Sequence, residues 1–132
     1  MPTASSRRFR AGLQRAYEVQ VEGEVLKKKR RVLSHLLRST SAKMPVDTGR
    51  ARANTIISIG RRDYTWEEFY DPQGQLNVRA GQVVIGQDRN PYAKAYVQNN
   101  VPYILMLESG HSNQAPLGVF AVATAELGVM NL

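Results

Sequence analysis

Apolar residues recur at spacings of four and seven over the first third of the chain. Within the proline-free segment 6–43 they form one series: Leu13, Tyr17, Val21, Val25, Val32 and Leu36. This spacing predicts one long amphipathic helix, with Ser5 or Ser6 as its N-cap. At about 1.5 Å per residue the helix is roughly 50 Å long, more than a small domain needs. We therefore expect part of it to project or to pack on another subunit, and we expect any kink or break at Gly23.

Short elements follow Pro45, which ends the helix. The pattern predicts a short helix over 50–54 and strands over 55–59, 78–86 and 93–98. It also predicts two further helices, over 103–107 and 119–127. Pro102 and Gly110 bound the helix over 103–107. Residues 61–77, with a turn at 71–74, are expected to form an inserted loop or hairpin. The order predicts an α+β fold: a long N-terminal helix packed on a small, mostly antiparallel sheet, with one or two short C-terminal helices.

The length of 132 residues is that of one domain, so we expect a single domain over 1–132 with a flexible end at 1–8. The absence of cysteine excludes a disulfide framework, an iron–sulfur cluster and a cysteine nucleophile. No run approaches the roughly 20 apolar residues that cross a bilayer. The arginine-containing N-terminus lacks the apolar region of a secretion signal. The expectation is a soluble protein without a membrane partner that does not leave the cell by the general route.

Positive charge is concentrated in one half of the chain. The net charge is +7, because residues 1–62 hold 15 basic and 4 acidic side chains (+11) and residues 63–132 hold 3 and 7 (−4). The densest run consists of Lys27, Lys28, Lys29, Arg30 and Arg31. On a helix, Lys28 falls near the apolar stripe, while Lys27 and Arg31 share a face. The run is a candidate contact for DNA phosphates or an acidic partner, and a solvated helix surface is the alternative.

The triplet Asp47-Thr48-Gly49 has the sequence with which aspartic proteases present one carboxylate of their catalytic pair. A homodimer could bring two copies of Asp47 together. In such proteases the triplet follows a β-strand, whereas here a long helix and Pro45 precede it. We therefore favour a turn that caps the following short helix.

Other chemistry-bearing residues do not form a catalytic pattern. His35 and His111 are the two histidines, and His35 is expected to be a packing or surface residue. Residues 108–112 are polar, but adjacency in sequence is not the hydrogen-bonded geometry of nucleophilic catalysis. No phosphate loop, HExxH motif or metal-ligand cluster is present. We therefore expect neither an enzyme nor a cofactor.

Three segments in a fixed order carry a resemblance. They are PVDTGRARAN at 45–54, the stretch from YA at 92–93 to YI at 103–104 ahead of LESG at 107–110, and SNQAPLG at 112–118. Together they resemble the neck and tail-completion proteins of long-tailed bacteriophages, a family that includes the lambda tail protein Z type. The likeness covers roughly residues 10–128.

The resemblance implies a virion structural protein without catalysis, assembled in the host cytoplasm. It would form a homo-oligomeric ring, sixfold or twelvefold, between the head connector or adaptor and the tail terminator or tail tube, with genomic DNA as a further contact. Residues expected at its interfaces are Asp47, Thr48, Gly49, Arg50, Arg52, Tyr103, Glu108, Gly110, Gln114 and Pro116. Two alternatives remain: a small basic DNA-binding protein acting through 27–31 and, less favoured, a homodimeric aspartic protease using Asp47.

Overall fold

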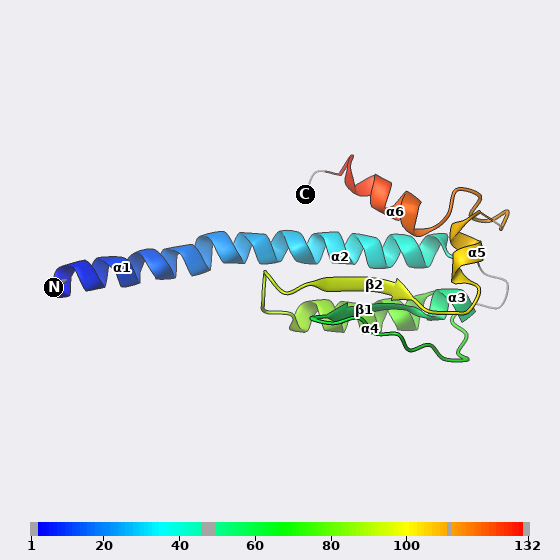
Figure 1. Cartoon of the computed structure of the whole chain (residues 1–132), viewed down its shortest axis with the longest axis horizontal. Helices are drawn as coiled ribbons and strands as arrows, with labels where there is room; N and C mark the ends of the chain where they lie inside the picture. The colour runs from blue at the N-terminus through cyan, green and yellow to red at the C-terminus, as the bar shows by residue number, and fades with distance from the viewer. Residues whose placement is uncertain (1–2, 46–49, 111, 131–132) are drawn as a thin grey trace.

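The longest element is one helical rod that runs the length of the molecule (Figure 1). In this computed structural model, which describes residues 3–45, 50–110 and 112–130, the rod consists of α1 (Ala4–Ala16), the π-helical segment η1 (Tyr17–Glu22) and α2 (Gly23–Lys43). The N-cap is Thr3, not Ser5 or Ser6, because the Thr3 hydroxyl accepts the Ser6 amide at 3.1 Å. The helix thus begins inside the segment expected to be a flexible end.

The rod does not break at Gly23. Gly23 has helical angles, φ −62° and ψ −42°, so the expectation of a kink or break there is wrong. The irregularity lies in the six residues before it, where the backbone adopts the wider π-helical turn. Such a turn inserts an extra residue into the hydrogen-bonding pattern without ending the helix.

The body packs around the second half of the rod. Its elements are α3 (Arg50–Ala53), β1 (Thr55–Ile59), α4 (Gln75–Gln87), β2 (Ala95–Asn99), α5 (Ile104–Glu108) and α6 (Phe120–Leu127). Within the described residues the strands form a two-stranded antiparallel sheet, with Thr55 opposite Asn99 and Ile59 opposite Ala95. The sheet and α4 lie along one side of α2, and α6 lies along another (Figure 1). This arrangement confirms the α+β prediction.

Most predicted boundaries agree with the structure to within two residues. This holds for the helices at 50–54, 103–107 and 119–127 and the strands at 55–59 and 93–98.

Two apolar clusters form the core. One joins α2 to the sheet and α4 through Leu33, Leu37, Ile57 and Ile85. The other, at the C-terminal end of α2, contains Met44, Ala51, Val101, Ala115 and Val119. On α2 the buried apolar positions are thus Leu33 and Leu37, one residue on from the predicted Val32 and Leu36, which are only half-buried. One residue is about 100° of rotation on a helix, so the predicted stripe lies beside the core-facing side.

The predicted strand at 78–86 is wrong, because this segment is part of α4. The helix begins where the buried carboxylate of Asp71 accepts the amides of Leu76 at 2.8 Å, Asn77 at 3.2 Å and Gln75 at 3.3 Å. These amides have no partner inside the helix, and a carboxylate also interacts favourably with the positive end of the helix dipole. The predicted turn at 71–74 is present, and it positions the carboxylate of Asp71 at the first turn of α4.

One face of α4 approaches α2 and β1 very closely. The buried positions Asn77, Gly81 and Ile85 are four residues apart, which is a helical repeat and not the alternation of a strand. A Cβ at Gly81 would lie 2.5 Å from Cδ2 of Leu37 and 3.3 Å from Cγ1 of Ile57. Glycine at this position therefore sets the distance between the two helices.

The segment between β1 and α4 is an irregular loop, which we call the 61–74 loop. No strand is found in it, so the hairpin alternative is wrong for these residues, all of which the structure describes. The side chain of Asn54 fixes its middle by donating to the carbonyl of Glu67 at 2.9 Å and accepting its amide at 2.8 Å. Asn100 donates to the carbonyl of Asp63 at 2.7 Å. The loop is thus tied to the body at two points.

Gly81→Ala tests the close approach. We expect it to lower the free energy of unfolding by about 1–3 kcal/mol, the usual cost of overpacking a core, although alanine favours helix. Gly86→Ala is the matched control, because a Cβ there meets nothing within 4 Å. It should raise the free energy of unfolding by about 0.5–1 kcal/mol. Urea denaturation measures both variants, and stabilisation by both would contradict the packing described.

Candidate assembly surface

The N-terminal part of the rod is not covered by the rest of the chain. No residue of α1 is buried in the described structure, and α1 extends well past the body (Figure 1). Phe9 is 68% exposed and Leu13 56% exposed. They are four residues apart, so they lie on one face of the helix. Apolar side chains gathered on an exposed surface mark interaction sites.

A pair of tyrosines marks the point where the rod leaves the body. The hydroxyls of Tyr17 and Tyr92 lie 2.8 Å apart. This hydrogen bond raises the pKa of Tyr92 to about 12, with smaller contributions from burial and from the charge of Glu22. Both side chains are exposed, so the contact joins η1 to the loop before β2 without burying either ring.

The predicted basic run does not form a single surface. Lys29 lies 2.5 Å from the carboxylate of Asp88 and donates to the carbonyl of Asn90 at 2.9 Å. Arg30 donates to the carbonyl of Asp88 at 2.8 Å. Burial opposes ionisation of Asp88, but the hydrogen bond from Lys29 and others outweigh it and lower the pKa. Lys29 and Arg30 therefore fasten α2 to the C-terminal end of α4.

The other three residues of the run, Lys27, Lys28 and Arg31, remain exposed. Lys27 pairs with Glu24 at 3.3 Å in a contact that leaves both side chains 66% exposed. Such exposed pairs are worth about 0–1 kcal/mol. The charge open to a polyanion is thus smaller than the run of five suggests.

Arg50 and Tyr103, both expected at an interface, lie together. The guanidinium of Arg50 is 4.9 Å from the centre of the Tyr103 ring, and its Nε donates to the Tyr103 hydroxyl at 3.2 Å. It also lies 5.8 Å from the Trp66 ring and donates to Glu68 at 2.8 Å. The hydrogen bond to Tyr103 raises the pKa of Arg50, so this group stays charged. The cluster joins α3, α5 and the 61–74 loop.

Arg52 has an internal role. It donates to the carbonyls of Ala42 at 2.9 Å and Met44 at 3.0 Å, and to that of Pro72 at 2.7 Å. The first two carbonyls end α2, and the third belongs to the 61–74 loop. Burial lowers the pKa of Arg52, as expected for a partly desolvated cation. Arg52 thus connects the rod to the loop.

Glu108 is a cap for another helix. Its carboxylate accepts the amides of Val119, Phe120 and Ala121, each at 2.8 Å. Burial alone would raise the pKa of Glu108, but the three donors outweigh it and hold the pKa below its ordinary value. One side chain thus satisfies the amides at the start of α6 and closes the loop that leads to it.

The closed loop after α5 forms a narrow corner. Gly110 has φ +83°, and a Cβ there would lie 2.3 Å from the carbonyl oxygen of Pro116. Gly118 has φ +87° and approaches the carbonyl oxygen of Glu108 in the same way. Gln114 and Pro116, both expected at an interface, are exposed on this corner.

The other predicted interface residues, Asp47, Thr48 and Gly49, lie outside the described residues. So does His111. The proposals for Asp47, whether as a cap or as a protease carboxylate, stay predictions.

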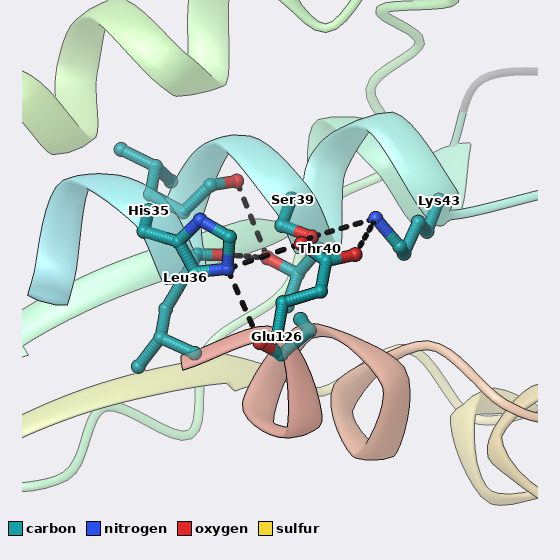
Figure 2. Close-up of polar contacts among 8 residues, drawn as sticks. His35, Leu36, Ser39, Thr40, Lys43 and Glu126 are labelled. Atoms are coloured by element: carbon teal, nitrogen blue, oxygen red, sulfur yellow. Dashed lines mark hydrogen bonds and ion pairs between the residues drawn. The ribbon is translucent and has the colours of Figure 1, made fainter. Parts of the chain in front are cut away.

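The densest group of reactive side chains lies where α6 meets α2 (Figure 2). Nε2 of His35 is 3.2 Å from the carboxylate of Glu126, Ser39 donates to the same carboxylate at 3.1 Å, and Lys43 forms an ion pair with it. Lys43 also donates to the Ser39 hydroxyl at 2.9 Å. A serine beside a lysine can be a nucleophile and its base. Here Lys43 is paired with Glu126 and Ser39 is buried, so the group serves to attach α6.

No protein-family model, curated protein or solved structure matches this chain. Across the described residues, no three His, Asp or Glu side chains gather as a metal site requires. In the same residues, no helix is long and apolar enough to cross a bilayer.

Sequence reasoning missed a cleft between β1, α4 and the 61–74 loop. Its apolar wall on α4 consists of Leu76, Ala80 and Val84. These residues are four apart, so the pattern becomes visible only when 75–87 is interpreted as a helix. The sequence signal that could have found it is Asp71 in the turn at 71–74, because an aspartate just before residue 75 can cap a helix that begins there.

Glu108→Gln tests the cap on α6. We expect it to lower the free energy of unfolding by about 2 kcal/mol, since hydrogen bonds to a charged group are stronger than neutral ones. Glu24→Gln, at an exposed pair, should cost under about 1 kcal/mol. Chemical denaturation compares the two, and equal costs would contradict a capping role.

The attachment of α6 should depend on pH. The hydrogen bond from Lys43, with help from Ser39 and the neighbouring charges, lowers the pKa of Glu126 below 4.5. Its stabilisation is therefore complete above pH 4.5 and is lost as the pH falls through the folded-state pKa. Glu126→Gln should be less stable than the unsubstituted chain at neutral pH, and the gap should close in acid. Urea midpoints across this range measure it, with Glu67→Gln as control; a constant gap would refute the assignment.

Proposed function

We propose that this protein is a structural subunit of the head-to-tail neck of a long-tailed bacteriophage, assembling as a homo-oligomeric ring that joins or completes the tail at the head connector. The observation that carries the proposal is the projecting α1 with its exposed apolar face. A lone copy leaves this face in water, which costs free energy for every apolar side chain on it. A subunit that packs against a neighbour removes this cost.

The rigidity of the body supports an assembly role. The corner after α5 is held by Glu108 and by the close approach of Gly110 to Pro116. The cluster around Arg50 is held by two rings and a carboxylate. Surfaces that are ordered before docking lose little conformational entropy on binding. Such surfaces suit contacts that repeat around a ring.

Charge gives a second line of support. The residues of α1 include the arginines Arg7, Arg8, Arg10 and Arg15 and no acidic residue. A helix of this kind can contact acidic surfaces of a neighbouring protein or the DNA in the channel. Lys29 and Arg30, by contrast, are engaged inside the chain.

Native mass spectrometry and negative-stain imaging, alone and with the adjacent head and tail proteins, test the proposal. We expect a closed ring, formed either alone or on a partner. The double variant Phe9→Gln/Leu13→Gln should abolish the ring and leave the unfolding midpoint unchanged, because both residues are exposed. Val129→Gln, at a residue 89% exposed near the C-terminus, is the matched control. A protein that stays monomeric with every partner contradicts the proposed function.

A further inference from the structure

The exposed apolar face of the rod extends beyond α1. Phe9, Leu13, Tyr17, Val21 and Val25 recur every four residues, and all five are exposed. In a regular α-helix this spacing drifts by about 40° per step, because each residue turns about 100°. The π-helical turn of η1 lies in the middle of the series and has more residues per turn, which counters the drift. The five side chains, which we call the rod stripe, therefore stay on one face.

A groove follows the middle of the rod stripe. It is open, has a volume of about 610 Å³, and is lined by Leu13, Tyr17 and Val21 together with polar neighbours. All of its lining residues lie between 10 and 21, so the body contributes no wall to it. An apolar helix surface of this kind accepts another amphipathic helix, whose anchors are three or four residues apart.

The charge changes sign along this part of the rod. The helix α1 holds four arginines and no acid, whereas residues 17–24 hold three glutamates and no base. Glu18 accepts a hydrogen bond from Gln14, and Glu24 pairs with Lys27. Both contacts are exposed to solvent and therefore weak. The rod is thus basic at its free end and acidic nearer the body.

A second copy running antiparallel complements both the stripe and the charge. Its order of charges is reversed, so the basic part of each copy lies beside the acidic part of the other. A parallel copy in the same register would place the arginines together. The antiparallel register that pairs the stripe with itself has Phe9 opposite Val21 and Leu13 opposite Tyr17. This is an isologous contact, in which the same surface is used by both copies.

The residues beside the rod stripe meet opposite charges in this register. Arg8 and Glu24 each come one residue before a member of the stripe, so they lie on the same flank. Two-fold symmetry places equivalent flanks together, which brings Arg8 of one copy near Glu24 of the other. On the other flank, Arg10 and Glu22 each come one residue after a member of the stripe and meet in the same way.

The length of α1 also fits this register. Its first residue, Ala4, lies opposite Leu26, one residue before the basic run begins at Lys27. The arginines of one copy therefore do not overlap the lysines of the other. The overlap covers residues 4–26, about 35 Å of helix.

We propose that two copies of this chain pair through residues 4–26 of their rods, packed antiparallel along the rod stripe. The inference goes beyond the proposed function, because the pair forms whether or not pairs then assemble into a ring.

Cysteine cross-linking tests the register in the full-length protein. The chain has no cysteine, so a single introduced cysteine reacts alone. Ala16 lies beside the stripe at the centre of the overlap, where the two-fold axis brings it near its own copy. We expect Ala16→Cys to give a covalent dimer with a short bismaleimide. Ala11→Cys, at an exposed alanine of α1 on the opposite face, is the matched control and should give about tenfold less product or lower.

Charge reversal tests the pairing of the flanks. Arg8→Glu and Glu24→Arg should each weaken dimerisation by about tenfold or more, because each places like charges opposite each other. An equimolar mixture of the two variants should restore it, since every contact in the mixed pair again joins opposite charges. Arg7→Glu, on the opposite face of α1, is the control and should leave dimerisation unchanged. Sedimentation equilibrium measures all four samples.

The outcomes separate this inference from the proposed function. A linked dimer that the mixture restores supports the pair even where no ring is imaged, and the neck function then falls alone. Rings that form without an Ala16→Cys link, or that do not respond to Arg8→Glu, overturn the antiparallel pair and leave the neck function standing. A chain that is monomeric alone but forms a ring on a head or tail protein has the same meaning.

Discussion

The contact between α2 and α4 at Leu37 and Gly81 determines where the rest of the body lies. Leu37 is fully buried, and the missing side chain of Gly81 lets the two helix axes approach until Leu37 and Ile57 fill the space between them. The strand β1 is held against both helices by Ile57, and β2 pairs with β1. Because α4 is fixed in this way, the face beside its buried one, with Leu76, Ala80 and Val84, forms the wall of the cleft. One small residue, Gly81, thus belongs both to the core contact and to the lining of the cleft.

Several acidic residues of the C-terminal half act within the chain. Asp71 and Glu108 accept the free amides of α4 and α6, and Asp88 and Glu126 pair with cations of α2. Each carboxylate joins segments that are distant in sequence or begins a helix. The basic residues of α2 are therefore partly neutralised by the body, whereas those of α1 meet no such partner within their own helix. The two halves of the rod therefore differ in how far their positive charge is neutralised: α2 has acidic partners in the body, and α1 has none within its own helix.

Much of the fold was predictable because its signals are local. The proline-free amphipathic run predicted the rod, and the short strands and C-terminal helices followed from β-branched runs, prolines and glycines. The error at α4 has a physical cause: residues 78–86 are rich in valine and isoleucine with an internal glycine, features that favour a strand when taken alone. The helix depends on the cap that Asp71 supplies from the preceding turn and on contact with Leu37, which is distant in sequence. The roles of Arg52 and Glu108 likewise depend on partners in other segments of the chain, so they could not be derived from the positions of these residues in the sequence.

The apolar series that predicted the rod has two different structural roles. Its C-terminal members lie beside the core, while Leu13 and Tyr17 lie on the exposed part. A helix that only had to pack on its own body could begin near η1, because the contact between Tyr17 and Tyr92 lies at the edge of the body. The additional turns extend the same apolar face and add arginines. Hydrophobic burial and charge both favour a surface that is apolar, acidic and on another molecule.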